Sequence, residues 1–372
     1  MAGPGGLRTY SDVVMTDMQA AAVAGDAGAE PAEVPERPWP GVSVIMPVLD
    51  EELHLADSVR EVLAQEYAGD LELVIALGPS KDGTERVAQG LAAADPRIRL
   101  VPNPTGRTPA GLNAALRAAT HDIVVRVDGH GILTPGYVSR AVRLLERTGA
   151  ANVGGLMLAV GVTAFQQAVA RAYSSRVGLG GASFHVGGVE GPAETVYLGV
   201  FRRAVLEGLG GFDEHYVRAQ DWELNYRIRQ AGEVVWFSPD LGVTYRPRSS
   251  WTELVRQFFN TGRWRREVMR RHPDTVSLRY LAPPAATGAI VAGTAAGVLG
   301  VVGSVPALRW GFVPPVVYGV GLAAAALVEG RGLSWRARAC LPAVLATIHL
   351  SWGSGFLVGR RPPKTRTTGK GA

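Results

Sequence analysis

Residues 121–130 read HDIVVRVDGH, a short run of branched apolar residues that ends on Asp128 and His130. An apolar run of this length, bounded by polar residues, predicts a buried β-strand. The two polar side chains bracket Gly129, so both can point to the same side of a sheet edge. The stretch therefore predicts a strand with a polar cluster at its end.

The residues before this strand alternate between strand and helix patterns. The predicted strands are 42–48, 71–77 and 98–102, and the predicted helices run from about Leu53 to Tyr67, from about Thr84 to Ala93, and onward from Thr108. This alternation predicts an α/β fold with a mostly parallel sheet, whose ligands bind at the carboxyl ends of the strands. Asp50–Glu52, Gly78–Thr84 and Asp128–His130 all follow strands, so we predict that they converge.

The composition of the 372 residues bounds the rest of the chain. Residues 1–39 are rich in Ala, Gly, Pro and Glu, and they cannot bury enough surface to offset the entropy lost on ordering. We predict a disordered leader there rather than a secretory signal, because Asp12 and Asp17 interrupt its mildly apolar stretch. The single cysteine, Cys340, excludes an intrachain disulfide and disfavours a zinc site.

The net charge of +5 conceals a local excess of arginine. Eight arginines lie between Arg246 and His272, against only Glu253 and Glu267. Such a segment binds an acidic partner, either ligand phosphates or the headgroups of anionic lipids. Interleaved aromatic residues such as Trp251 also fit an amphipathic helix at a membrane interface.

Three apolar runs follow, at 281–303, 312–328 and 340–358, with 23, 17 and 19 residues. A helix needs about 20 residues to cross a bilayer. We predict about three transmembrane helices within 276–360 and a basic tail at 361–372.

Charge leaves the orientation of these helices open. Arg331, Arg336 and Arg338 favour a cytosolic loop before the third run. Three full spans would then place the tail outside, yet the tail is also basic and favours the cytosol. Either the third run is re-entrant or interfacial, as His349 and Trp352 suggest, or the tail departs from the rule.

Six motifs occur in a fixed order: VSVIMPVLDEE, GPSKDGT, NPTGRTPAGLNAAL, VRVDGH, the stretch 194–232, and RQFFNTGRWR. Together they resemble glycosyltransferase family 2, and within it the succinoglycan-biosynthesis glycosyltransferases, over residues 40–275. The resemblance implies a Rossmann-like GT-A domain that ends in the basic segment. It also implies inverting sugar transfer from a nucleotide-diphosphate donor, with a UDP-sugar favoured, and no binding of nucleic acid.

Asp128 and His130 stand where family members usually carry Asp-x-Asp. In the resemblance this pair holds a divalent cation, Mn²⁺ or Mg²⁺, which neutralises the leaving diphosphate. The histidine departs from the usual second aspartate and favours Mn²⁺, which tolerates nitrogen ligands. The alternative is an aspartate that caps a turn and a solvated histidine.

Asp221 is the candidate general base, at the place of the family's Glu-Asp pair. Gln220 replaces the glutamate, and Glu223 follows as a backup or orienting group. The alternative is that Asp221 caps the amphipathic helix that begins there. Both can hold, because a helix N-terminus stabilises a charged carboxylate.

The other predicted site residues form two sets. The donor-binding set is Pro47, Asp50, Glu51, Asp82, Arg107, Asn113, Asp128 and Gly129. The set for the acceptor or the diphosphate is Gly154, Gly155, Glu194, Thr195, Gln220, Glu223, Gln257, Arg263 and Trp264. The last three resemble the family's Gln-x-x-Arg-Trp element with a wider spacing, and the alternative for them is contact with lipid headgroups.

The nucleobase of the donor stays open, because Leu77-Gly78-Pro79-Ser80 replaces the aspartate pair that usually reads it. We expect a multi-pass protein of the plasma membrane, with a cytosolic catalytic domain and a lipid-linked, polyprenyl-type acceptor. Its pathway would be exopolysaccharide or cell-envelope glycan synthesis. The alternatives are a processive polysaccharide synthase, disfavoured by the few spans, and a non-catalytic nucleotide-sugar-binding or scaffold protein.

Overall fold

The computed structural model describes residues 38–360, which fall into two units. The first unit holds the described residues up to Arg248 together with Glu329–Leu341, and the second unit holds the remainder. The predicted tail lies outside the described residues, as does the predicted leader apart from Pro38 and Trp39. Trp39 packs edge-on against Tyr67, with ring centroids 5.3 Å apart. Trp39, at the end of the predicted leader, is therefore packed against the first unit.

A nine-stranded sheet forms the first unit, in the order β3-β2-β1-β4-β8-β6-β9-β5, with β7 beside β9. The strands are β1 (Val42–Val48), β2 (Leu71–Leu77), β3 (Ile98–Pro102), β4 (Ile123–Arg126), β5 (Ile132–Leu133), β6 (Asn152–Ala159), β7 (Gly191–Pro192), β8 (Tyr197–Arg202) and β9 (Val235–Tyr245). β1 to β4 run parallel, as predicted. β8 runs antiparallel between β4 and β6, so the sheet is mixed.

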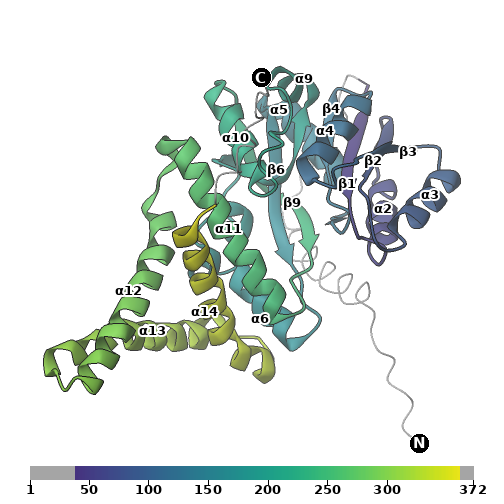
Figure 1. Ribbon diagram of the computed structural model, residues 1–372. Helices are drawn as coiled ribbons and strands as arrows, with labels where there is room; N and C mark the ends of the chain where they lie inside the picture. Colours follow the sequence, from purple (N-terminus) through teal and green to yellow (C-terminus); the bar gives the residue numbers. More distant parts are fainter. Residues whose placement is uncertain (1–37, 361–372) are drawn as a thin grey trace, which may run out of the picture. The chain divides into compact units, whose positions relative to one another are not determined.

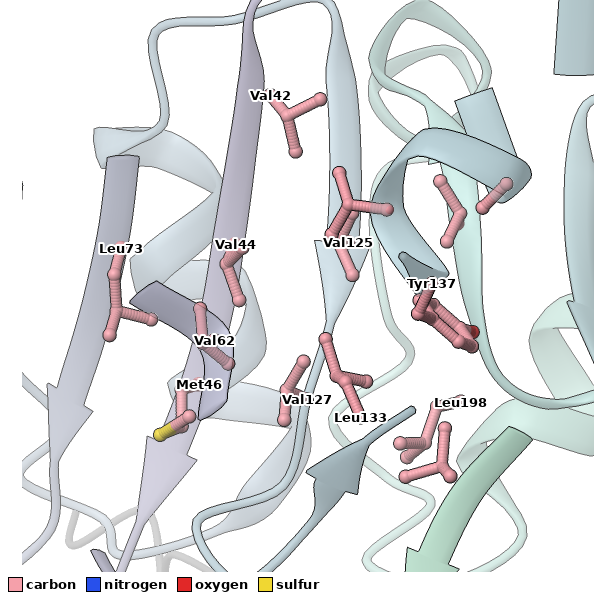
Figure 2. Close-up of a cluster of buried hydrophobic side chains, with 14 of the residues drawn as sticks. Val42, Val44, Met46, Val62, Leu73, Val125, Val127, Leu133, Tyr137 and Leu198 are labelled. Carbon is pink, nitrogen blue, oxygen red and sulfur yellow. The ribbon is translucent and has the colours of Figure 1, made fainter. Parts of the chain in front are cut away.

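Helices cover both faces of this sheet (Figure 1). They are α2 (Leu55–Leu63), α3 (Thr84–Ala94), α4 (Thr108–Ala118), α5 (Tyr137–Thr148), α6 (Ala164–Tyr173), α7 (Arg176–Leu179), α8 (Ser183–Val186), α9 (Arg203–Gly208) and α10 (Gln220–Gln230). Val44 and Met46 of β1 join one apolar cluster with residues of α2 and α5, which Figure 2 shows. Ile45 points to the opposite cluster, beneath α4 and α10. Burial on both faces explains the continuous apolar runs of these strands.

Two element ends differ from the sequence prediction. β4 ends at Arg126, so Asp128 lies in the turn after the strand rather than at its last position. The first helix ends at Leu63 instead of about Tyr67, with Ala64 as its C-cap.

The second unit is helical, and its elements are α11 (Trp251–Arg271), η1 (Pro273–Thr275), α12 (Leu278–Val302), η2 (Pro306–Phe312), α13 (Val313–Glu329) and α14 (Trp335–Val358). Three helices in the described residues are long and apolar enough to cross a membrane, judged by length and composition: Leu278–Val302, Pro306–Glu329 and Trp335–Val358. The boundary between the two units falls inside α14, after Leu341.

Candidate active site

The loops after β1 and β2 are joined by hydrogen bonds at the carboxyl edge of the sheet. Asp50 turns the chain in the left-handed region, with a φ of 55°, and its Oδ1 accepts the backbone N–H of Lys81 at 2.7 Å. The backbone N–H of Glu51 donates to Thr84 Oγ1 at 2.7 Å. These two loops converge as predicted.

His130 joins the turn after β4 to the same cluster. Its Nδ1 lies 2.7 Å from Glu51 Oε1. Burial lowers the pKa of His130, but the hydrogen bond and charge of Glu51 and the charge of Asp128 outweigh it, so the pKa is raised overall. A Cβ at Gly129 would lie 2.9 Å from Val48 Cγ1, so glycine lets this turn press against β1.

Arg126, the last residue of β4, connects Asp128 with Asp221. Its side chain is 3% exposed, its Nη2 lies 3.1 Å from Asp128 Oδ1, and its Nη1 pairs with Asp221 Oδ1. Each carboxylate side chain is 24% exposed, so each can meet a ligand while it shares a buried cation. The predicted metal ligand Asp128 and the predicted base Asp221 thus share one arginine, and these three residues form the Arg126 junction.

Sequence reasoning missed Arg126, although a signal was present. An arginine that ends the apolar strand IVVR is almost never fully buried unless it is paired with an acid. The family motifs identify the two aspartates but not the arginine that pairs with both of them.

A buried polar chain fixes α10, which carries Asp221 in its first turn. Asn152 Nδ2 donates to Asn225 Oδ1 at 2.6 Å, and Asn225 Nδ2 donates to Thr195 Oγ1 at 2.9 Å. The N-cap of α10, Ala219, has a φ of 64°, which turns the chain sharply into the helix. The predicted acceptor residue Thr195 thus helps to position the candidate base.

Glu223 lies inside this support rather than on the open side of the site. Its side chain is 3% exposed, and both its oxygens accept from Arg227, at 2.7 and 2.9 Å. Arg227 also donates to the carbonyls of Leu209 and Gly211. These contacts brace α10, and a role of Glu223 toward the acceptor stays a prediction.

Asn113 braces the segment that leads to α10. Its Nδ2 donates to Phe212 O at 2.8 Å and to Glu214 Oε1 at 3.1 Å, and its Oδ1 accepts the N–H of Phe212 at 2.8 Å. Its amide is thus bonded to protein atoms. Arg107 is exposed at the N-cap of α4, and Pro47 lies against Gly111 of the same helix. Donor contacts of these three residues stay predictions.

The paired glycines of β6 allow close strand packing. A Cβ at Gly154 would lie 2.7 Å from Val196 Cγ2, and Gly155 backs directly onto the backbone of Leu241. The register of β6 shifts at this point against both neighbours. Glu194 is exposed, and its carbonyl accepts from Arg229. Acceptor contacts of Gly154, Gly155 and Glu194 stay predictions.

Two arginines and two tyrosines lie close to one another and to His130, and none of them was assigned to the site from the sequence. Burial lowers the pKa of Arg218, and the charge of Arg248 lowers it further. The rings of Tyr173 and Tyr245 stack with centroids 5.7 Å apart, and Tyr245 lies 6.4 Å from the His130 ring. Arg218 lies only three positions before the candidate base Asp221, and this proximity in sequence could have indicated a place near the site.

A polar depression of about 600 Å³ opens beside the start of α3, and it is lined by Glu52, Lys81, Asp82, Gly83, Glu85, Arg86 and Gln89. The hydroxyl of Thr84 donates to Asp82, and this bond lowers the pKa of that carboxyl. Neither Asp128 nor Asp221 lines the depression, so we do not place the chemistry there.

Gln257, Arg263 and Trp264 belong to α11 in the second unit. Arg263 Nε donates to Gly359 O at 2.8 Å. Trp264 is 8% exposed, and the Arg360 guanidinium lies 3.6 Å from its ring centroid. The predicted roles of these three residues and of Gln220 in binding the acceptor or the diphosphate stay predictions.

The residues at the junction fit a divalent cation that arrives with a diphosphate. No three His, Cys, Asp or Glu side chains gather around a metal position in the described part of the chain. One or two protein ligands suffice, however, when phosphate oxygens and water complete the coordination. Nδ1 of His130 lies against a carboxylate, so Nε2 would be the ring nitrogen that binds a metal, and proteins commonly orient a ligating histidine in this way.

Comparison with known proteins accords with this geometry. The family model described as Glycosyl transferase family 2 matches residues 43–210. The Succinoglycan biosynthesis protein ExoA of Rhizobium meliloti (strain 1021) is 32% identical over 323 residues, which cover 84% of this chain and 93% of that protein. The dolichyl N-acetyl-alpha-D-glucosaminyl phosphate 3-beta-D-2,3-diacetamido-2,3-dideoxy-beta-D-glucuronosyltransferase of Methanococcus voltae is 22% identical over 230 residues, covering 59% of this chain and 71% of that protein.

Among solved structures, the mannosyltransferase PcManGT from Pyrobaculum calidifontis, in complex with GDP-Man and Mn²⁺, superposes with a TM-score of 0.53 at 20% identity. The superposition covers 90% of this chain and 92% of that one, and it shows the GT-A fold. With the extent and identity of the ExoA match, the comparisons establish that the chain is a glycosyltransferase and belongs to glycosyltransferase family 2.

Proposed function

We propose that this enzyme transfers a sugar, with inversion, from a nucleotide-diphosphate donor to a lipid-linked, polyprenyl-type acceptor. The observation that carries the proposal is the Arg126 junction, where Asp221 lies beside Asp128 at the ligand-binding edge of the sheet. The names of two relatives support the class of product, since one acts in succinoglycan biosynthesis and the other on a dolichyl phosphate-linked sugar. The pathway would be exopolysaccharide or cell-envelope glycan synthesis.

In the proposed step, Asp221 takes the proton of the acceptor hydroxyl as that oxygen bonds to the anomeric carbon of the sugar. The bond from that carbon to the phosphate oxygen breaks, and its electron pair leaves with the nucleoside diphosphate. Arg126 fixes the position of the Asp221 carboxylate through a charge-assisted hydrogen bond. A near-attack geometry of this kind can supply several kcal/mol of the acceleration.

Charge on the leaving diphosphate has two candidate partners. A divalent cation held by Asp128 and His130, Mn²⁺ or Mg²⁺, would neutralise it. Arg218 and Arg248 lie close enough to repel each other, and a diphosphate placed between them would relieve that repulsion. A UDP-sugar is the favoured donor.

The membrane supplies the acceptor in this proposal. The three apolar helices associate the enzyme with a bilayer, which we propose is the plasma membrane. The first unit would face the cytosol, where nucleotide-sugars are made.

Nucleotide release from a panel of nucleotide-sugars tests the proposal. The detergent-purified chain would be assayed with Mn²⁺ or Mg²⁺ and a lipid extract, beside Asp221→Asn and the control Asp70→Asn, an exposed residue that precedes β2. We expect metal-dependent release that falls roughly 10²–10⁴-fold in Asp221→Asn and stays unchanged in the control.

Other results would point elsewhere. Full release by Asp221→Asn would remove the base assignment. Binding of a nucleoside diphosphate without release from any donor would favour a non-catalytic protein. Long polymer made by the chain in vesicles would favour a processive synthase.

A further inference from the structure

The segment between α13 and α14 belongs to the first unit. Arg171 of α6 donates from Nη1 to the carbonyl of Glu329 at 2.7 Å, and Ser334 Oγ donates to Gln167 Oε1 at 3.4 Å. This segment therefore lies on the same side of any membrane as the sheet. The chain reaches α12 from that side too, because α11 begins at Trp251, directly after the last residues of the first unit.

The pair α12 and α13 thus leaves the side of the first unit and returns to it. Protein buries only 22% of the most apolar window of α12 and 11% of that of the span Pro306–Glu329, which joins η2 and α13. Valines such as Val291 and Val320 are each 65% exposed. Beyond α12, Leu308 of η2 folds back against Gly300. An apolar surface of this size, with a return at its far end, suits a hairpin of two helices through lipid.

α14 is more buried than this pair, at 33% of its most apolar window, and its buried residues lie along one side. Its buried residues recur three or four positions apart, and each is 0–1% exposed: Ala337, Leu341, Val344, Leu345 and Ile348. This spacing marks a single stripe along the helix. The stripe is typical of a helix that lies on protein rather than one surrounded by lipid.

The C-terminal end of α14 is fastened to α11. Gly355 contacts the backbone of Phe259, and Gly262 contacts the backbone of Trp352, so the two helices touch along their main chains (Figure 1). Arg266 Nη1 donates to the carbonyl of Leu357 at 2.5 Å, and Arg263 Nε donates to that of Gly359 at 2.8 Å. Two arginines of α11 therefore satisfy the carbonyls that the end of α14 leaves open.

α11 itself cannot cross a bilayer. It carries arginines from Arg256 to Arg271, and an arginine at the centre of a spanning helix strongly disfavours insertion. It is not among the helices with the length and composition of a span. Since α11 starts on the side of the first unit and does not cross, the end of α14 that it holds lies on that side as well.

We propose that α12 and α13 form a hairpin through the bilayer, whereas α14 does not cross and lies with α11 at the membrane surface. Both ends of α14 then share the side of the first unit, and the basic tail follows on that side. This arrangement places the loop with Arg331, Arg336 and Arg338 and the tail together, as the positive-inside rule requires of cytosolic segments. With three spanning helices the basic loop and the basic tail would lie on opposite sides of the membrane, whereas with two spanning helices they lie on the same side.

Cysteine accessibility tests the proposal in the full chain. In a Cys340→Ser background, single substitutions Ser304→Cys, Ser334→Cys and Thr367→Cys would probe the hairpin turn, the segment before α14 and the tail. Intact spheroplasts would be treated with a membrane-impermeant maleimide, before and after permeabilisation. We expect Ser304→Cys to react in intact spheroplasts, and the other two only after permeabilisation.

Two results would overturn it. Reaction of Thr367→Cys but not of Ser334→Cys in intact spheroplasts would show that α14 crosses the bilayer, whereas reaction of both would contradict only the cytosolic side of the proposed function. Reaction of Ser304→Cys only after permeabilisation would show that the hairpin does not cross the bilayer.

C-terminal fusions of the otherwise unaltered chain guard against a cysteine variant that fails to fold. A fluorescent protein should be bright and alkaline phosphatase inactive, and the opposite pair of readings also contradicts the proposal.

Discussion

The Arg126 guanidinium holds two carboxylates that lie far apart in sequence, Asp128 and Asp221. Breaking a buried ion pair by removal of one partner typically costs about 3–5 kcal/mol, because the other charge stays buried and uncompensated. The planar fork of arginine also fixes the direction of each carboxylate, which an ammonium group does not do. Arg126 is thus a positioning residue for the proposed base.

We expect Arg126→Lys to lower kcat of nucleotide release more than it changes KM, by roughly 10–100-fold, because a misplacement of about 1 Å can cost that much. Arg202→Lys is the matched control, since Arg202 bonds backbone carbonyls and an exposed glutamate. Steady-state kinetics and thermal unfolding would be measured for both. An unchanged kcat in Arg126→Lys would leave Arg126 with a purely structural role.

His185 gives the first unit a sensitivity to acid. Its ring lies 4.2 Å from that of Phe184, and burial lowers its pKa to about 4. Between pH 6.5 and about 4 the unfolded chain binds a proton that the folded chain does not. The free energy of unfolding therefore decreases as the pH is lowered through this window, by up to about 1.4 kcal/mol per pH unit.

We expect His185→Phe to remove part of this acid sensitivity. Melting temperatures at about pH 7.5 and about pH 5 should differ less in the variant than in the native chain. An equal difference in both would mean that His185 does not carry the effect.

At single positions Asp128 and His130 were predicted because charged side chains after an apolar strand need a ligand or a partner, and Asp221 was predicted from the resemblance to the family. The motifs did not predict which of the remaining polar residues support others. The side chain of Asn113 bonds a segment about 100 positions away, and that of Glu223 bonds Arg227, four positions away. Only the folded structure shows these contacts.

At the scale of elements, periodicity predicted β1 to β4 and the helices between them, since each is a continuous apolar pattern bounded by turn residues. It did not predict the antiparallel place of β8 between β4 and β6. Strand pairing at that distance is set by tertiary packing, and short elements such as α7, α8 and β7 carry too few residues to show a period.

The contact of α11 with α14 depends on glycine, and a methyl group should separate the helices. We expect Gly262→Ala to lower the melting temperature in detergent, because its Cβ would meet the Trp352 carbonyl. Gly319→Ala is the matched control, since nothing lies within 4 Å of that position and alanine favours a helix by up to about 1 kcal/mol. Equal melting temperatures in the two variants would contradict the close contact.

At the scale of the molecule, the first unit is not one continuous stretch of chain. We predicted a catalytic domain that ends at residue 275, and that boundary stays a prediction. The structure groups α11 with the other helices and returns Glu329–Leu341 to the first unit. Sequence patterns could not show this return, because it depends on contacts such as that of Arg171 with the Glu329 carbonyl.

A chain that ends after Arg248 should therefore be less stable than its length suggests. It lacks the segment that Arg171 and Gln167 contact, and for a domain of this size each kcal/mol lost lowers the melting temperature by about 2–4 °C. Thermal unfolding would be compared with that of a chain that ends after Arg360. If the shorter chain melts no earlier than the first transition of the longer one, the returning segment is dispensable.

The return of Glu329–Leu341 also orders the events of biogenesis. A ribosome delivers the nine strands first, then α12 and α13, and only afterwards the piece that closes against α6. Under the proposed topology that piece reaches its place once the hairpin has passed into lipid. Maturation of the transferase would thus be timed by its own insertion, and a nascent chain that misses the membrane would be left with an unfinished fold for proteases to recognise.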